Sequence, residues 1–281
     1  MKKSTAILVL LAASLLWSTG GFLIKSVDWH PMAISGMRSL IAALFLTAVL
    51  RPKPLRLSPL AFGGAVAYAT TVTLVVVATR LTTAANAIFL QYTSPFYVAI
   101  FSIWFLGERP SRADWGALLV ILGGMLLFFF EELDTNGCWG IFAALGAGMS
   151  FAWLTLFLRK QRDADPVVSI VLGNYLAALA GLPFMFGALP GPAGWLALGL
   201  LGVAQIGLPY WLYALAIRKV SAIEAVLLVT LEPVLNPLWV FLLIGEVPGY
   251  FTLAGGMVII VSVTLRALLP LRGTSQPGSR G

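Results

Sequence analysis

The same short motif occurs twice in this chain. Gly107-Glu108-Arg109-Pro110 recurs 138 residues later as Gly245-Glu246-Val247-Pro248. The same offset relates Ser94-Pro95 to Glu232-Pro233. A long-period repeat of this kind indicates that the chain consists of two homologous halves with similar folds.

The amino-acid composition indicates whether the two halves fold in water or in lipid. Apolar residues make up 59% of the 281 residues and charged residues only 10%, whereas a soluble domain carries about 45–50% apolar and about 25% charged residues. So much apolar surface has to face lipid. Apolar stretches close to the roughly 20 residues that a bilayer requires are predicted at 5–25, 32–50, 58–79, 83–105, 112–130, 137–158, 166–186, 194–216, 222–244 and 250–269.

Five spans in each half determine how the halves insert. An odd number of spans gives two homologous halves opposite orientations in the membrane, and inverted repeats are typical of transporters. We therefore expect an all-α integral membrane protein with ten transmembrane helices, arranged as two inverted five-helix repeats around a central cavity. The repeats comprise residues 1–134 and 135–271, and the Gly/Ser/Pro-rich residues 272–281 are expected to form a disordered cytoplasmic tail.

The basic residues predict the topology. With a cytoplasmic N-terminus, fifteen of the 18 Lys and Arg residues fall on the cytoplasmic side, Lys25 and Arg80 fall in outer loops, and Arg38 falls inside a span. This positive-inside bias predicts that both termini are cytoplasmic. The first apolar stretch is longer than the core of a signal peptide, about 7–15 residues, so we expect it to be retained as a span. Because the basic residues are spread over short loops, the net charge of +7 does not indicate nucleic-acid binding.

Three prolines lie inside predicted spans. Pro95 is in the fourth span, and Pro233 and Pro237 are in the ninth, which occupies the corresponding place in the second half. A proline removes a backbone hydrogen bond and bends the helix. Paired interruptions at corresponding positions point to the binding site and the gates of a transporter, and a packing kink is the alternative.

Two charged residues lie at membrane depth, Arg38 in the second span and Glu232 near the middle of the ninth. A charge there costs at least about 2.5–3.5 kcal/mol, so each should face the interior and have a partner. For Arg38, a substrate carboxylate and a structural pair are both open. For Glu232, the open roles are proton coupling, binding of a substrate amine and capping of backbone freed by the prolines. Asn236 and Trp239 continue the Glu232 face at helical spacing.

Aromatic residues with polar neighbours occur near several span midpoints. Aromatic walls with a few polar groups suit an apolar or aromatic ligand of modest size, and ordinary packing is the alternative for individual residues. The candidate substrate-binding residues are Trp17, Ser18, Arg38, Tyr68, Gln91, Tyr92, Tyr97, Trp153, Asn174, Gln205, Tyr210, Tyr213, Glu232 and Asn236.

The two Gly-Glu-x-Pro segments are predicted to be loops in which glycine ends one helix and proline starts the next. Inversion places Glu108 on the cytoplasmic side and Glu246 on the outer side. Gating and helix capping are both open for these glutamates, and capping is the role that we expect.

These features resemble a known family. Two five-helix halves, a tryptophan in the first helix of each half (Trp17 and Trp153) and the repeated Pro…Gly-Glu-x-Pro pattern are similar to the ten-helix, EamA-type branch of the drug/metabolite transporter superfamily. The aromatic-rich interior is most similar to the aromatic amino-acid exporters of the YddG kind. The resemblance implies export of small organic solutes across the bacterial inner membrane by alternating access, with hydrophobic or aromatic amino acids as the first candidates.

Other functions are less well supported by the residues. A proton-coupled exporter of lipophilic cations that works through Glu232 is the alternative, and a membrane-embedded enzyme or receptor is a remote one. The sequence has no Walker motif, no HExxH and no metal cluster around its single Cys138 and His30. We therefore expect no catalysis, cofactor or metal. The expected partners are a small-molecule substrate and membrane lipids, without nucleic acid, and a monomer is predicted to suffice.

Overall fold

The computed structural model describes residues 1–50, 58–82, 84–129, 138–244 and 250–268, and in these residues every regular element is a helix. Three features predicted from the sequence lie outside the described residues. They are the second copy of the repeated motif at 245–248, the boundary between the two halves at 134–135, and the tail at 272–281.

The helices fall into two groups along the chain. Those before residue 130 are α1 (Lys3–Trp17), α2 (Gly20–Lys25), α3 (Pro31–Leu50), α4 (Pro59–Leu81), α5 (Ala84–Gln91), α6 (Ser94–Phe105) and α7 (Arg112–Phe129). Those after residue 137 are α8 (Cys138–Lys160), α9 (Val167–Gly181), η2 (Leu182–Phe184), α10 (Pro192–Leu200), η3 (Leu201–Gly207), α11 (Leu208–Ala216), α12 (Ala222–Leu228), η4 (Val229–Leu231), α13 (Glu232–Ile244) and α14 (Tyr250–Leu268).

Eight helical stretches are long and apolar enough to cross a membrane. They are Lys3–Lys25, Pro31–Val49, Pro59–Leu81, Ala87–Phe105, Trp139–Lys160, Val167–Phe184, Pro192–Ala216 and Ala222–Leu243. The other two predicted spans coincide with α7 and α14, helices of 18 and 19 residues. That these two helices also cross the membrane stays a prediction.

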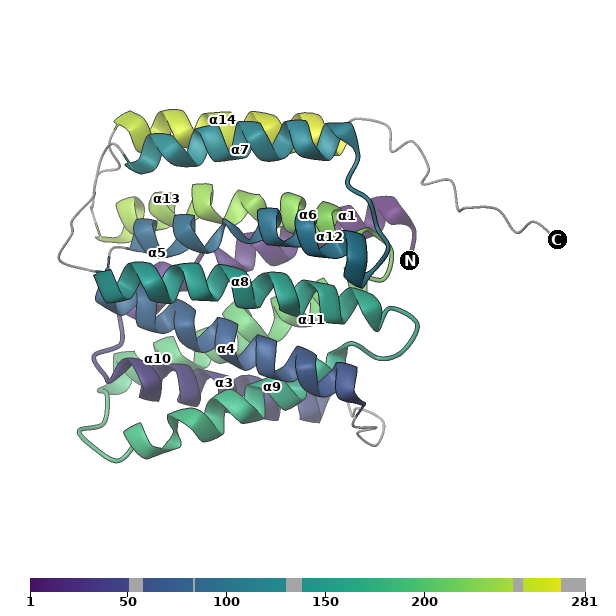
Figure 1. Ribbon diagram of the computed structural model, residues 1–281. Coiled ribbons are helices and arrows are strands. Elements are labelled where there is room, and N and C mark those ends of the chain that lie inside the picture. The colour runs from purple at the N-terminus through teal and green to yellow at the C-terminus, as the bar shows by residue number, and fades with distance from the viewer. Residues whose placement is uncertain (51–57, 83, 130–137, 245–249, 269–281) are drawn as a thin grey trace.

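The two groups of helices interleave instead of forming separate bodies. α8 packs on α4, α5 and α6, while α9 packs on α3 and α4. In Figure 1, α7 and α14 lie side by side as an outer pair, and the remaining helices form the bundle beneath them. The interface between the early and late parts of the chain therefore runs through the centre of the bundle.

Loops that were predicted to lie on one side of the membrane meet at one end of the bundle. Lys3 Nζ lies 3.1 Å from Glu224 Oε1 near the start of α12, and Arg218 Nε donates to the Arg162 carbonyl oxygen at 2.8 Å. At the other end, the ring of His30 stacks on a phenylalanine of η2 at 4.7 Å. Which of the two ends faces the cytoplasm stays a prediction.

Three of the long apolar stretches are interrupted. The interruptions separate α1 from α2, α5 from α6, and α12 from α13 through η4. Pro95 and Pro233 are each the second residue of the helix that follows an interruption, where the missing N–H is tolerated. Pro237 was expected to interrupt the ninth span, and this expectation is wrong, because α13 continues through Pro237. The bond that Pro237 cannot make would go to the Pro233 carbonyl, in the first turn of the same helix.

Candidate functional site

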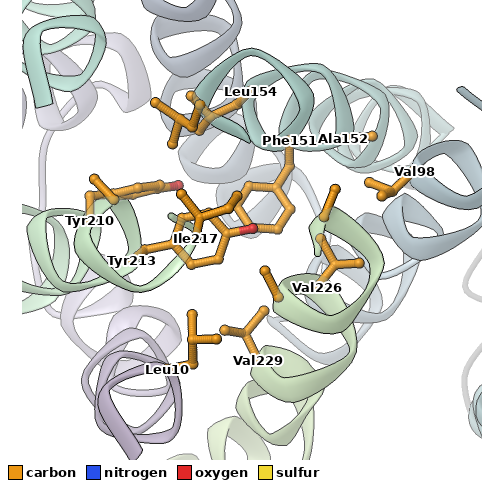
Figure 2. Close-up of a cluster of buried hydrophobic side chains, with 14 of the residues drawn as sticks. Leu10, Val98, Phe151, Ala152, Leu154, Tyr210, Tyr213, Ile217, Val226 and Val229 are labelled. Atoms are coloured by element: carbon orange, nitrogen blue, oxygen red, sulfur yellow. The ribbon is translucent and has the colours of Figure 1, made fainter. Parts of the chain in front are cut away.

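An aromatic cluster lies at the centre of the bundle, next to the interruption between α1 and α2. The Trp17 ring meets Tyr210 edge-on at 4.7 Å and Phe151 at 6.0 Å, and Tyr210 meets Tyr68 at 4.6 Å between ring centroids. Figure 2 shows Phe151 pointing from α8 toward Tyr213 of α11. We call Trp17, Tyr68, Phe151, Tyr210 and Tyr213 the central aromatic cluster. Edge-to-face contacts of this kind hold rings in fixed positions, so the cluster offers a preformed aromatic surface.

Arg38 of α3 is buried beside this cluster, with 1% of its surface exposed. Its Nη1 donates to Gln205 Oε1 at 3.0 Å and its Nη2 donates to the Val72 carbonyl oxygen at 2.7 Å. Among the described residues no carboxylate pairs with it, and its Nε has no hydrogen-bond partner. A guanidinium has five N–H donors, so a buried positive charge with free donors is available at the centre of the molecule.

Gln205 reaches Arg38 because the helix that carries it is locally widened. η3 is a π-helix, a form that often occurs at functional sites, and Pro209 follows as the second residue of α11. Gly202 lets η3 approach α3 closely, since a Cβ there would lie 2.6 Å from Ile41 Cβ. Gly20 leaves room for the amide, since a Cβ there would lie 2.6 Å from Gln205 Nε2.

Glu232 is also buried, at the first position of α13. The Tyr92 hydroxyl oxygen lies 2.7 Å from Glu232 Oε2 and 2.7 Å from the Val229 carbonyl oxygen. The Val229 carbonyl also accepts from the Ser14 hydroxyl at 3.0 Å. Tyr210 lies close enough to both Glu232 and Arg38 to interact with each electrostatically. The centre therefore holds one basic and one acidic group, and Tyr210 interacts electrostatically with both.

The polar face of α13 closes the site against the α1–α2 interruption. Trp239 Nε1 donates to Ser18 Oγ at 2.9 Å. Asn236 is buried against Gly21, where a Cβ would collide with the Asn236 amide oxygen. The helical face of Glu232, Asn236 and Trp239 that the sequence indicated therefore points into the bundle.

Two other candidates, Asn174 and Gln91, are buried at the edge of the site. Asn174 Nδ2 donates to the Ile170 carbonyl oxygen in its own helix, and its amide lies close to the Tyr68 hydroxyl. Gln91 ends α5, where its carbonyl oxygen would lie 2.6 Å from a Cβ at Gly148 of α8. Asn174 thus faces the central aromatic cluster, whereas Gln91 marks a close crossing of two helices.

Two candidates lie elsewhere. Trp153 of α8 stacks on Phe101 at 5.2 Å, and Tyr97 stacks on Phe101 at 6.4 Å. This lateral aromatic cluster also includes Trp104, which is 64% exposed on the outside of the bundle. Trp153 and Tyr97 therefore belong to a surface between α6 and α8 and do not join the central aromatic cluster.

The residues of α8 that do face the centre were not among the candidates. Phe151 contacts Trp17 and Tyr213, and the Thr155 hydroxyl lies 2.9 Å from the Tyr213 hydroxyl. Both residues are two positions away from Trp153, which places them on a different face of the helix. The pattern of α8 gives no clear signal for this face, because apolar residues lie on every side of the helix.

Glu108, from the first copy of the repeated motif, links several helix ends. Gly107 adopts a positive φ of 71° after α6, a conformation that glycine adopts without strain. The turn directs Glu108 so that Oε1 lies 2.6 Å from Arg159 Nε and Oε2 accepts from the Ala222 N–H at 3.0 Å. Glu108 therefore caps α12 and not the helix that follows it, since α7 is capped by Ser111 and Asp114.

Comparisons with known proteins identify the family. The sequence pattern of the EamA-like transporter family matches the chain twice, over residues 4–130 and 138–267. The pseudopaline exporter CntI of Pseudomonas aeruginosa is 32% identical over 187 residues, which cover 63% of this chain and 64% of that protein. The chain thus matches just under two thirds of the length of CntI.

Two further relatives and one solved structure are similar over longer stretches. An uncharacterized transporter of Archaeoglobus fulgidus is 30% identical, covering 69% of this chain and 71% of that protein. The threonine/homoserine exporter RhtA of Salmonella typhimurium is 27% identical, covering 96% and 93%. One crystal structure superposes with a TM-score of 0.79 at 20% identity, covering 97% of this chain and 100% of the other, and so shares its fold. The chain therefore belongs to the EamA-like transporter family and is a multi-pass membrane protein.

Proposed function

We propose that this protein exports small zwitterionic solutes across the bacterial cytoplasmic membrane, and that amino acids with hydrophobic or aromatic side chains are its main substrates. The central site binds the solute between Arg38 and Glu232, with the side chain of the solute against the central aromatic cluster.

One observation carries the proposal. Arg38 is fully buried, and among the described residues it donates only to a neutral amide and a backbone carbonyl and keeps Nε free. A buried charge without a counter-ion is costly unless a bound anion completes the site. A solute carboxylate is the anion whose geometry matches a guanidinium, because the two groups form paired, charge-assisted hydrogen bonds.

Glu232 supplies the complementary group for a solute ammonium. Both Glu232 and Arg38 interact electrostatically with Tyr210. A zwitterion placed over the ring meets an opposite charge at each end, so no net charge is buried. The central aromatic cluster then contacts the apolar part of the solute.

The relatives agree with this class of substrate. RhtA is named as an exporter of threonine and homoserine, and CntI is named as an exporter of pseudopaline. The central aromatic cluster favours larger apolar side chains for the present chain, since its rings pack against one another near the charged groups.

The proposed mechanism is alternating access between two inverted five-helix repeats, residues 1–134 and 135–271, with ten membrane spans and cytoplasmic termini. The separate family matches over 4–130 and 138–267 support two repeats. The helices that follow the interruptions, α6 and α13, begin at Ser94 and Glu232, 138 residues apart, which supports the equivalence of the two repeats. Because one chain supplies the central site, a monomer suffices for transport. Cross-linked samples that transport only as dimers would contradict this last point.

Glu108 forms the gate at the end of the bundle that also holds Lys3 and Arg218, which we assign to the cytoplasm. Its carboxylate joins the end of α8 to the start of α12, and Arg159 also donates to the Ile217 carbonyl oxygen at the end of α11. A solute that enters from this end requires these bonds to break. These bonds support the inference that the fold is closed at this end.

The test is counterflow of labelled phenylalanine into proteoliposomes that hold the purified protein, without a pH gradient. We expect exchange by the wild type and a loss of at least about tenfold in Arg38→Gln, because a charge-assisted bond to the carboxylate is removed. Arg80→Gln is the matched control, since Arg80 is an exposed cation at the end of α4. Equal exchange by Arg38→Gln and the wild type would overturn the proposed site.

A second candidate function, proton-coupled export of lipophilic cations, is favoured by the bonds of Tyr92. The hydroxyl has one proton but two acceptors at 2.7 Å, and both contacts become hydrogen bonds only when Glu232 carries a proton of its own. Under this alternative, a lipophilic cation would move only with a pH gradient, and Glu232→Gln would abolish the movement. Gradient-independent exchange of a zwitterion would favour the first function.

A further inference from the structure

Gln205 uses both ends of its amide within the protein. Its Oε1 accepts from Arg38 Nη1 at 3.0 Å, and its Nε2 donates to the Trp17 carbonyl oxygen at 3.3 Å. The side chain is buried and fits against Gly20. With one bond at each end, the amide is held in a fixed orientation by the protein.

For the Arg38 guanidinium, the neutrality of the Gln205 side chain matters more than its shape. An amide oxygen holds the guanidinium in place without cancelling its charge, whereas a carboxylate at the same position would form an ion pair with it. Among the described residues, no acidic side chain is bonded to Arg38, and its second bond goes to a neutral backbone carbonyl. The positive charge of Arg38 at the site is therefore preserved by the neutrality of its neighbour.

We propose that Gln205 determines which charge class of solute the transporter accepts. It positions Arg38 through a neutral amide and so reserves the guanidinium for a solute carboxylate. A glutamate in its place would act as a built-in carboxylate, fill the Arg38 subsite, and leave Glu232 as the only free charge. The site would then prefer amines without a carboxylate. This inference rests on the proposed function, because it assumes that Arg38 binds the carboxylate of the solute.

The experiment compares Gln205→Glu with the wild type in proteoliposomes, using two labelled probes of the same ring and chain. Phenylalanine carries a carboxylate and an ammonium, while 2-phenylethylamine carries the ammonium alone. We expect the wild type to exchange phenylalanine faster than the amine. The variant should reverse the order, with a loss of at least about tenfold for phenylalanine, the worth of a charge-assisted hydrogen bond.

Arg38→Gln separates the two possible failures. If Arg38→Gln loses phenylalanine exchange but Gln205→Glu keeps the wild-type preference, the role of Gln205 is overturned and the proposed function stands. If the wild type does not exchange phenylalanine, or if Arg38→Gln exchanges it normally, the proposed function itself fails.

Gln205→Leu keeps the inference testable if the glutamate variant is inactive toward both probes. Leucine removes both hydrogen bonds of the amide but adds no charge, so Arg38 stays available and is no longer positioned. We expect a higher KM for phenylalanine with little change for 2-phenylethylamine. An unchanged KM for phenylalanine would overturn the positioning role.

Discussion

Glu108 and Ala222 join the early and late parts of the chain through one hydrogen bond. Oε2 of Glu108 accepts from the backbone N–H of Ala222, the first residue of α12, at 3.0 Å. The other carboxylate oxygen lies 2.6 Å from Arg159 Nε. A single side chain from the loop after α6 therefore satisfies a helix N-terminus and an arginine at once, and its negative charge complements the dipole of α12.

Glu108→Gln should open this end of the molecule. The variant keeps an acceptor for the Ala222 N–H but loses the ion pair with Arg159, so we expect a loss of about 1–2 kcal/mol in the free energy of unfolding. A cysteine placed at the buried Val220, in a Cys138→Ser background, should react faster with a maleimide in the variant.

Arg162→Gln is the control for this prediction. Its Nη1 lies 4.0 Å from Glu108 Oε1, and its side chain is 49% exposed. Such a pair contributes little, less than about 1 kcal/mol. Equal labelling of Val220→Cys with and without Glu108→Gln would rule out the gate.

Gly20→Ala should impair transport because of a steric conflict with the site. The added methyl group would lie 2.6 Å from Gln205 Nε2 and would push the amide away from Arg38. We expect the KM for phenylalanine to rise by about tenfold, the worth of one charge-assisted hydrogen bond. Gly199→Ala is the matched control, since no atom lies within 4 Å of a Cβ at that position of α10. The control should transport normally, and a normal KM in Gly20→Ala would contradict the prediction.

Trp17→Leu and Trp153→Leu should have different effects although the two tryptophans occupy equivalent places in the sequence. Trp17 contacts three rings of the central aromatic cluster, whereas Trp153 contacts the lateral aromatic cluster. Removal of an aromatic contact worth about 0.5–1.5 kcal/mol should raise the KM for phenylalanine in Trp17→Leu. Initial rates over a concentration series check this, and a larger rise in Trp153→Leu would show that the site is placed wrongly.

Tyr92→Phe should slow transport more than Tyr213→Phe. The first substitution removes the hydroxyl that bonds both Glu232 and the Val229 carbonyl, leaving a buried carboxyl without that partner. The second removes only a contact with Thr155, whose hydroxyl still donates to the Phe151 carbonyl oxygen. We expect a loss of about tenfold for Tyr92→Phe and less than about threefold for Tyr213→Phe. Similar initial counterflow rates in the two variants would be the contrary result.

The sequence predicted the positions of residues that would be energetically costly anywhere else. Charges are expensive in lipid, so Arg38 and Glu232 had to face inward, and both are buried. Proline cannot donate a backbone hydrogen bond, so Pro95 and Pro233 could be placed next to helix interruptions. In each case a single energetic penalty restricts where the residue can lie in the fold.

No comparable energetic penalty indicates whether Trp153 or Phe151 of α8 faces the centre of the bundle. Lipid is as apolar as the core, so α8 is apolar on all sides and its pattern does not show which face points inward. The partner of Arg38 was also beyond prediction. Gln205 reaches it only through the π-helical turn of η3, and backbone hydrogen-bond registers of that kind leave no compositional signal.

The π-helical turn gives the transporter a sensitivity to chain length. Removal of one residue from η3 would restore an ordinary α-helix and abolish the widened turn that carries Gln205. Gln205 would then leave Arg38 even though every side chain of the site was still present. A one-residue deletion within Leu201–Gly207 should therefore reduce the preference for phenylalanine over 2-phenylethylamine, and an unchanged ratio would show that the turn is dispensable. Related chains could thus differ in substrate range through a single inserted or deleted codon, with no substitution at the residues that contact the solute.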